Sequence, residues 1–251
     1  MLSATALEGL PEVRPGADLG WLIVDAFARG GTELCAGHVL VVAHKVISKA
    51  EGRIRALQAV EPGPRATALA LDHGKDARHV QVVLDESRTL LRADHGVLIC
   101  VTPHGFVCAN AGVDASNAPE KDTVILLPKD PDASARALRT ALEDLTGVAP
   151  AILITDSFGR AWRNGQADIA IGCAGLQPFE DWRGRTDANG RELRATWIAV
   201  ADELAGAADL ARTKDGSQPV VLVQGAERHV TADHGPGAAA LLREESRDLF
   251  R

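Results

Sequence analysis

The stretch VAPAILITDSFGRAWRNGQADIAIGCAGL, residues 148–176, contains two apolar runs that each have the length of a β-strand. The first run ends at Asp156 and the second begins at Ala167, with a cluster of polar side chains between them. Short, nearly continuous apolar runs are typical of strands that are buried on both faces of a sheet. We therefore predict two strands, VAPAILITD and ADIAIGCAGL, joined by a polar loop that starts at Asp156.

The rest of the chain alternates between runs of strand length and longer amphipathic runs. The predicted strands are HVLVVAHKVIS (38–48), a hairpin in GVLICVTPHGFVCAN (96–110) that turns near Pro103–Gly105, and the runs TVILLP, TWIAV and PVVLVQG. Helical spacing predicts helices in DARHVQVVLDESRTLL (76–91), DPDASARALRTALEDLTG (130–147), ADELAGAADLAR (201–212) and GAAALLREESRDLF (237–250). The pattern indicates a mixed α/β (α+β) fold in which hairpins exclude an all-parallel sheet.

Composition narrows the class of protein. With 46% apolar and 24% charged residues among 251, the chain is that of an ordinary globular domain. The net charge of −7 and the lack of a long basic run argue against a nucleic-acid binder, and no apolar stretch is long enough to span a membrane. The four cysteines form no CxxC pair, so we expect reduced thiols in a cytoplasmic protein.

Two strand ends carry the same set of chemical groups. AGVDASN (111–117) contains Asp114 and a hydroxyl, and ITDSFGR contains Asp156 beside Ser157. Two carboxylates from separate strand ends can hold one Mg²⁺ together with water and substrate phosphates. The alternative is that both are Asx or ST turns that only cap loops. Arg160 and Arg163 follow Asp156 closely and are our candidates for a phosphate or carboxylate clamp.

A third polar segment, HKVISKAEGR (44–53), places Lys45, Lys49 and Arg53 at four-residue intervals. If a helix follows the preceding strand, Lys49 and Arg53 share a face and could contact phosphates, although a solvated helix edge is the alternative. The chain contains no GxxxxGK[ST] loop, no GxGxxG after a strand and no GxSxG elbow. The residues alone indicate metal-assisted chemistry on a phosphorylated small molecule.

Several motifs occur in a fixed order: GLPEVRPGADLG, HKVISKAEGR, NAGVDASN, ITDSFGRAWRNGQADIAIGCAGL and AVADELAGAADL. Together they resemble the coenzyme F420-0:L-glutamate ligase (F420 γ-glutamyl ligase) family over nearly the whole chain. The resemblance implies a fold peculiar to the family and an intertwined homodimer. It also implies that residues 1–251 form a single ligase domain without the nitroreductase-like domain that some relatives carry after it.

The resemblance implies a GTP-dependent reaction that needs Mg²⁺ or Mn²⁺, with K⁺ as an additional cation. GTP would activate the terminal carboxylate of F420-0 as an acyl phosphate. The amine of L-glutamate would then displace phosphate and form an amide, and later glutamates would add through γ-linkages. Phosphoryl transfer of this kind depends on positioning and charge neutralisation more than on covalent chemistry by the protein.

The resemblance also assigns roles to single residues. Asp114 and Asp156 fall at the first metal site and Ser157 at the second, and Lys49 with these aspartates forms the implied catalytic group. The positions that match nucleotide contacts are Leu10, Pro11, Glu12, Val13, His44, Lys49 and Asn117, and the late loop 211–218 with Thr213, Lys214, Asp215 and Gly216.

Three positions depart from the family pattern. His44 stands where relatives generally have serine, and Ser157 stands where they usually have threonine, which keeps the hydroxyl. Lys214 lies where a residue compatible with a metal is expected, and its charge would repel a second cation. Two other functions remain open from the sequence. A metal-dependent phosphohydrolase would consume nucleotide without glutamate or acceptor, and a nucleotide-binding module would show no turnover.

Overall fold

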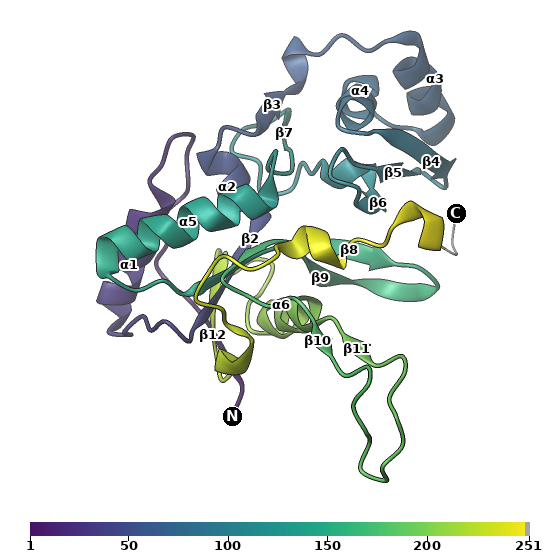
Figure 1. Ribbon diagram of the computed structural model, residues 1–251. Coiled ribbons are helices and arrows are strands. Elements are labelled where there is room, and N and C mark those ends of the chain that lie inside the picture. The colour runs from purple at the N-terminus through teal and green to yellow at the C-terminus, as the bar shows by residue number, and fades with distance from the viewer. Residues whose placement is uncertain (249–251) are drawn as a thin grey trace.

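A five-stranded sheet forms the centre of the computed structural model, which describes residues 1–248 (Figure 1). Its strand order is β1 (Ser3–Ala6), β12 (Val220–Gln224), β2 (Val39–Ala43), β8 (Ala151–Arg160) and β9 (Arg163–Ala174). β2 and β8 are parallel, and every other neighbouring pair is antiparallel. The mixed sheet confirms the predicted fold class.

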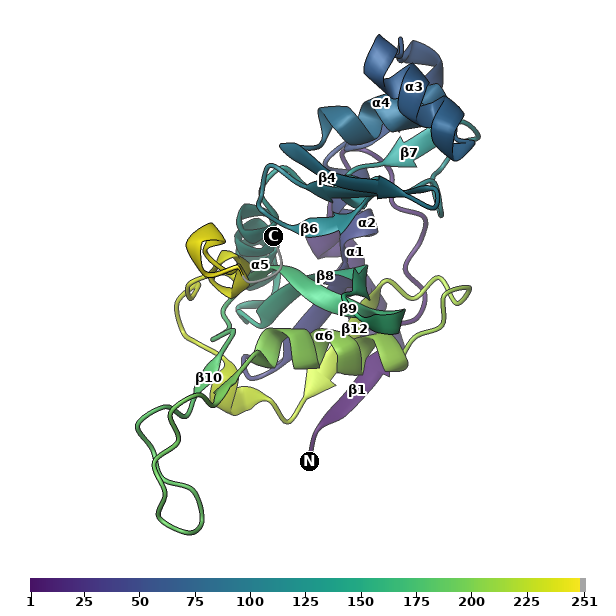
Figure 2. The ribbon, with the colours of Figure 1, turned by 90° about the vertical axis from the view of Figure 1, so that its right-hand side faces the viewer.

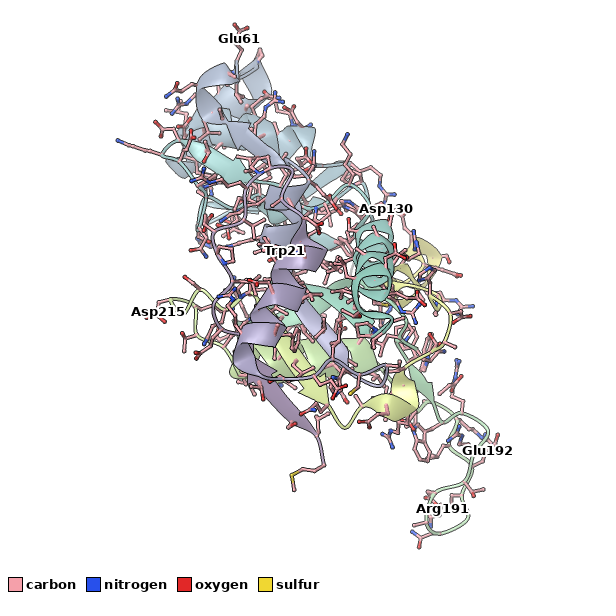
Figure 3. The ribbon with its side chains drawn as sticks, turned by 90° about the vertical axis from the view of Figure 1, so that its left-hand side faces the viewer. Trp21, Glu61, Asp130, Arg191, Glu192 and Asp215 are labelled. Carbon is pink, nitrogen blue, oxygen red and sulfur yellow. The ribbon has the colours of Figure 1, made fainter. Side chains whose placement is uncertain are left out.

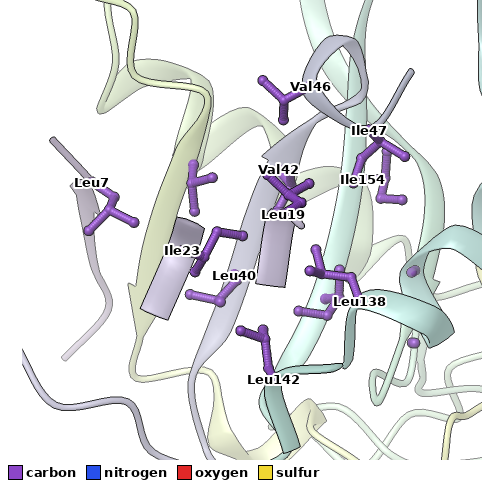
Figure 4. Packing of buried hydrophobic residues seen from close by; sticks show 14 of the residues in the cluster. Leu7, Leu19, Ile23, Leu40, Val42, Val46, Ile47, Leu138, Leu142 and Ile154 are labelled. Carbon is purple, nitrogen blue, oxygen red and sulfur yellow. The ribbon is translucent and has the colours of Figure 1, made fainter. Parts of the chain in front are cut away.

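Helices cover both faces of this sheet because its strands are apolar on both sides. In β2, Leu40 and Val42 pack into one core with α1 (Leu19–Gly30) and α5 (Pro131–Thr146), which Figure 4 shows from close by. Val39 and Val41 point the other way and pack against α6 (Val200–Leu210). This alternation follows from the two-residue period of a strand and produces three layers.

A second, smaller layer with its own apolar core lies beside α2 (His44–Ala50) and the sheet (Figure 1). It contains β3 (Ile54–Ala56), α3 (Pro64–His73), α4 (Ala77–Asp85), β4 (Thr89–Asp94), β5 (Val97–Val101), β6 (Val107–Ala109) and β7 (Thr123–Ile125). β5 and β6 are antiparallel neighbours, so the hairpin predicted in 96–110 is confirmed.

An arm projects from the body between β9 and α6 (Figure 2). Its base is the short pair β10 (Glu180–Asp181) and β11 (Trp197–Ile198), where the Phe179 and Trp197 rings stack with centroids 4.0 Å apart. Arg191 and Glu192 lie in its distal part (Figure 3). The arm is long relative to the strands at its base, and apart from the turn signal at 187–190 no sequence pattern predicted such a projection.

One predicted strand is shorter than expected. In 38–48, the strand ends at Ala43, and helix α2 (His44–Ala50) begins at the next residue. Val46 and Ile47 belong to this helix and pack into the main core. Periodicity cannot separate a buried strand from a short buried helix, so a continuous apolar run hid the boundary.

The polar segment after Asp156 is a strand instead of a loop. β8 continues to Arg160 and pairs with β9 from Ile152↔Ala174 to Arg160↔Arg163, so the turn lies at residues 161–162. Trp162 takes a left-handed φ of 59° in this turn. The backbone groups are satisfied by the facing strand, so an extended conformation needs no apolar side chains here.

Two of the four predicted helices differ from the structure, and those predicted in 130–147 and 201–212 are confirmed. The helix in 76–91 ends at Asp85 because the following residues leave for β4. The helix predicted in 237–250 is replaced by 3-10 turns at 238–241 and 245–247, with 249–250 outside the described residues. Asp132 of α5 accepts hydrogen bonds from the backbone N–H groups of Ala238 and Ala239, which fixes the start of this segment against α5. α5 is capped by Asp130 and ends at Gly147 as predicted.

All four cysteines are free thiols, of which Cys35 is exposed and the other three are buried. Burial raises the pKa of Cys108 and of Cys173 to about 12, so these thiols are protonated at neutral pH. Between residues 1 and 248, no helix combines the length and apolar character that crossing a bilayer requires.

Candidate active site at the start of helix α2

The parallel pairing of β2 and β8 brings the first candidate residues together. Ala43 at the end of β2 pairs with Thr155, so the next residues, His44 and Asp156, are neighbours at the same edge. His44 Nε2 lies 3.3 Å from Asp156 Oδ1, but the geometry gives this buried nitrogen no hydrogen bond. Its other ring nitrogen lies 3.3 Å from Ser48 Oγ. The imidazole is therefore fixed by α2 and faces the Asp156 carboxylate.

Asp114 approaches the same helix start from the smaller layer. Lys45 Nζ lies 2.6 Å from Asp114 Oδ2, and it also donates to Ser116 Oγ at 2.6 Å. The Ser116 backbone N–H and hydroxyl both donate to the Asp114 carboxylate at 2.7 Å. Burial works to raise the pKa of Asp114, but the hydrogen bonds from Lys45 and Ser116 outweigh it and hold the pKa below its usual value. Asp114 is thus an anion at neutral pH.

Asp114 and Asp156 therefore contact consecutive residues, Lys45 and His44, at the first turn of α2. The sequence predicted that both carboxylates stand at strand ends, which is wrong for Asp156 because β8 continues to Arg160, but the fold positions both around one helix terminus. Nowhere in residues 1–248 do three or more His, Cys, Asp or Glu side chains gather as a preformed metal site. Two carboxylates fit a Mg²⁺ or Mn²⁺ ion that takes its remaining ligands from water and phosphate.

Lys49 lies one helical turn after Lys45 and is almost fully buried, with 7% of its side chain exposed. Its ammonium pairs at 2.5 Å with Glu12 Oε1, from the segment Leu10–Val13 that precedes α1. The GLPEV motif and α2 are thus in contact, and their joint role in nucleotide binding stays a prediction. Arg53 lies beyond the helix and pairs with Glu86 at 2.7 Å, so the predicted face shared by Lys49 and Arg53 is wrong.

A second cluster surrounds Asp168, which the sequence analysis did not single out. This buried carboxylate faces Ser157 across the hairpin and accepts its hydroxyl at 2.6 Å and that of Thr155 at 2.9 Å. Arg212 binds it directly, and Lys214 Nζ lies 3.7 Å away. Burial works to raise the pKa of Asp168, but the Ser157 hydrogen bond and the Arg212 charge hold it below its usual value.

The late loop 211–218 brings Lys214 to this cluster. Lys214 Nζ donates to Ser157 Oγ at 3.1 Å and to Asp209 Oδ1 at 2.7 Å. Thr213, Asp215 and Gly216 are exposed, and Asp215 marks the loop in Figure 3. The Lys214 ammonium thus contacts the Ser157 hydroxyl that the resemblance assigned to a second metal ion, and that assignment stays a prediction.

Arg160 and Arg163 lie at the tip of the β8–β9 hairpin, where they pair across the turn and are exposed. Arg160 Nη2 donates to the carbonyl oxygen of Asn164 at 2.7 Å, which stabilises the turn. Asn117 lies in the exposed loop after Asp114 with a left-handed φ of 56°. A clamp role for the two arginines stays a prediction.

The fold and this arrangement define a mixed α/β protein with two carboxylates and two lysines gathered around helix α2. The sequence profile of the F420-0:gamma-glutamyl ligase family matches residues 9–225, and the chain belongs to that family.

Relatives named coenzyme F420:L-glutamate ligase are similar along almost their whole length. The protein of Methanothermobacter thermautotrophicus is 40% identical over 252 residues, covering 100% of this chain and 99% of the relative. That of Methanopyrus kandleri is 45% identical over 242 residues, covering 96% and 94%. That of Haloarcula marismortui is 41% identical over 253 residues, covering 98% and 94%.

Proposed function

We propose that this chain is a ligase that adds L-glutamate to coenzyme F420-0 by forming an amide, with GTP as the energy source. Family membership and the names of relatives that align over nearly the whole chain support the acceptor and the amino acid. The observation that carries the proposal is the convergence of Asp114 and Asp156 on the lysine-bearing helix α2. Carboxylates beside cationic side chains suit phosphoryl transfer, since both kinds of group position and neutralise phosphates.

The reaction has two steps. In the first, a carboxylate oxygen of F420-0 attacks the γ-phosphorus of GTP, the bond to the bridging oxygen breaks, and GDP leaves. In the second, the glutamate nitrogen attacks the acyl carbon, the carbon–oxygen bond to phosphate breaks, and phosphate leaves as the nitrogen loses a proton. Further glutamates would add by the same two steps on a γ-carboxylate.

In this proposal, Asp114 and Asp156 hold the divalent cation, Mg²⁺ or Mn²⁺, which when bound neutralises phosphate charge. Lys45 and Lys49 add fixed positive charge from one face of α2. Lys49 is paired with the largely exposed Glu12, so a nucleotide phosphate could replace that carboxylate as its partner. The other proposed nucleotide contacts are Leu10, Pro11, Val13, His44, Asn117 and residues 213–216, with K⁺ as an additional cation.

We further propose that the chain acts as a homodimer. The projecting arm supports this, because a long two-stranded extension with a minimal core of its own is marginally stable in isolation and gains by packing against another chain. Light scattering after size-exclusion chromatography measures the mass in solution. A monomer at micromolar concentration would contradict the proposal.

Mass spectrometry of products tests the ligase directly. The protein is incubated with F420-0, L-glutamate, GTP and Mg²⁺ or Mn²⁺, and we expect glutamylated product with one GDP released for each glutamate added. Equal GTP consumption without glutamate or acceptor would indicate a phosphohydrolase, and nucleotide binding without turnover would indicate a binding module. Both outcomes contradict the proposal.

A pair of variants tests the site within the same assay. Asp156→Asn should abolish glutamate addition while the protein stays folded, because the neutral amide cannot hold a cation against phosphate. Asp144→Asn, at an exposed position of α5, is the control and should behave as the wild type. Near-normal turnover by folded Asp156→Asn would exclude the proposed metal role.

A further inference from the structure

We propose that the side chains of Arg212 and Lys214 provide the positive charge at Ser157 in place of a second metal ion. The enzyme would then use one divalent cation per nucleotide, held by Asp114 and Asp156. The inference rests on the proposed function, in which a nucleoside triphosphate binds at the start of α2. It differs from the expectation drawn from the sequence, in which Ser157 binds a second metal ion.

Consecutive residues of β8 point to opposite faces of the hairpin. Asp156 contacts His44 on the α2 side, whereas Ser157 contacts Asp168 directly across the ladder and Lys214 beyond α6. This separation follows from the two-residue period of a strand, and it holds because β8 continues past Asp156. The Ser157 hydroxyl therefore has a set of partners that is separate from that of Asp156.

Three hydrogen-bond donors and one nearby ammonium group surround the Asp168 carboxylate beside Ser157. It accepts the hydroxyls of Thr155 and Ser157, binds Arg212 directly, and has the Lys214 ammonium 3.7 Å away. Two carboxylate oxygens offer about four lone-pair positions, and three of them already accept hydrogen bonds, so a metal ion that took more than one position would displace one of these partners. Displacement of Arg212 is costly because only 8% of its side chain is exposed.

The charges of the cluster are also balanced. Asp168 and Asp209 face Arg212 and Lys214, so two carboxylates meet two cations at distances of 3.7 Å or less. A divalent ion placed at Ser157 would add two positive charges beside two existing ones without a new anion from the protein. Repulsion at this range disfavours it, most strongly where burial lowers the dielectric constant.

Lys214 is placed to contact a ligand as well as the cluster. Its side chain is 71% exposed, so the ammonium reaches the cluster from the solvent side. Its hydrogen bonds to Ser157 and Asp209 use two of three N–H donors, and the third can meet a phosphate oxygen. A lysine acts on phosphate as a point charge. It can therefore neutralise phosphate charge at the position where a second metal ion would otherwise do so.

Counting bound manganese tests the proposal without measuring turnover. Wild-type protein is saturated with a non-hydrolysable GTP analogue and titrated with Mn²⁺, and bound ions are counted by electron paramagnetic resonance. We expect one ion per chain. Two ions per chain, or none, would overturn the inference.

Variants of Lys214 test whether its charge is used. Lys214→Met should weaken binding of the Mg²⁺-loaded analogue by about tenfold or more, the scale of one charge-assisted contact, whereas Lys214→Arg should retain most of the affinity. Lys75→Met, in the turn between α3 and α4, is the matched control and should bind as the wild type. Unchanged affinity in Lys214→Met, with the fold confirmed by circular dichroism, would overturn the inference.

Failure of this inference is distinguishable from failure of the proposed function. Glutamate addition measured on the same wild-type preparation reports on the ligase assignment, whatever the number of manganese ions. A second ion in a protein that still glutamylates F420-0 would refute the lysine role alone.

Discussion

Replacement of Asp168 by asparagine should destabilise the protein more than any other single removal of a carboxylate at the site. Asparagine keeps the shape of aspartate but not its charge, so Arg212 loses its direct partner inside the protein. Breaking a buried ion pair costs about 3–5 kcal/mol, because the remaining charge stays desolvated. Asp209 Oδ1, 3.7 Å from Arg212 Nε, provides partial compensation. We therefore expect a loss of about 3 kcal/mol, the lower end of that range.

Urea unfolding followed by tryptophan fluorescence measures this loss as a lower midpoint at unchanged slope. For a chain of this length, a change of about 3 kcal/mol corresponds to a fall in Tm of roughly 6–12 °C. Asp181→Asn is the matched control, because Asp181 also pairs with an arginine, Arg183 at 2.6 Å, but on the exposed arm. Exposed pairs contribute little, so this variant should unfold close to the wild type.

A double variant separates the charge effect from a packing effect. Asp168→Asn combined with Arg212→Met removes both charges, and we expect it to recover part of the stability lost in the single variant. If Asp168→Asn unfolds at the same urea concentration as Asp181→Asn, the reasoning from the buried Arg212 charge is refuted. If the double variant loses the full sum of two single losses, an unpaired guanidinium is not the cause.

Three further predictions concern pH, nucleotide binding and packing. The pKa of Asp168 is lower in the folded protein, so the ionised Asp168 carboxylate stabilises the fold above the ordinary carboxyl pKa of about 4, and this stabilisation is lost as the pH falls below that value. The urea midpoints at pH 7 and pH 3 should therefore differ less in Asp168→Asn than in the wild type. Lys49→Ala should weaken GTP binding by about 1–3 kcal/mol, and unchanged affinity in titration calorimetry would contradict a phosphate contact. Gly172→Ala should destabilise the protein by about 1–3 kcal/mol, because the added Cβ would lie 2.4 Å from the Pro131 carbonyl oxygen. Gly206→Ala should stabilise it by about 0.4–1 kcal/mol, because the added Cβ meets open space within α6. Thermal unfolding that ranks the two variants the other way would contradict this reasoning.

Local patterns predicted the elements whose signals lie within a few residues. The helix at Pro131–Thr146 has an aspartate cap, a proline in the first turn and a left-handed glycine after its end. The apolar runs that became β2, β8, β9 and β12 were recognisable because both faces of the central sheet are covered. Asp114 and Asp156 were identified as polar side chains that follow such runs.

Other features depended on partners that are distant in sequence. Asp168 gave no signal, since its partners Thr155 and Arg212 lie 13 and 44 residues away and meet it only through hairpin pairing and the packing of α6. The C-terminal segment has helical spacing but, within the described residues, forms only 3-10 turns, and its start is held by Asp132, which lies 106 residues away from Ala238. Such contacts are invisible to periodicity, because they are decided by where another element lies.

The sequence by itself determined the chemistry of this protein: which carboxylates, hydroxyls and lysines it carries, and the order of motifs that indicated its family. Tertiary structure decided how these groups are shared between sites. Asp156 and Ser157 are adjacent in sequence and were predicted to serve neighbouring metal ions. Because β8 stays extended, they face opposite sides of the hairpin, Asp156 toward His44 and Ser157 toward Asp168 and Lys214. Side-chain direction along a strand follows from backbone pairing, and β9 supplies that pairing from more than ten residues further along the chain.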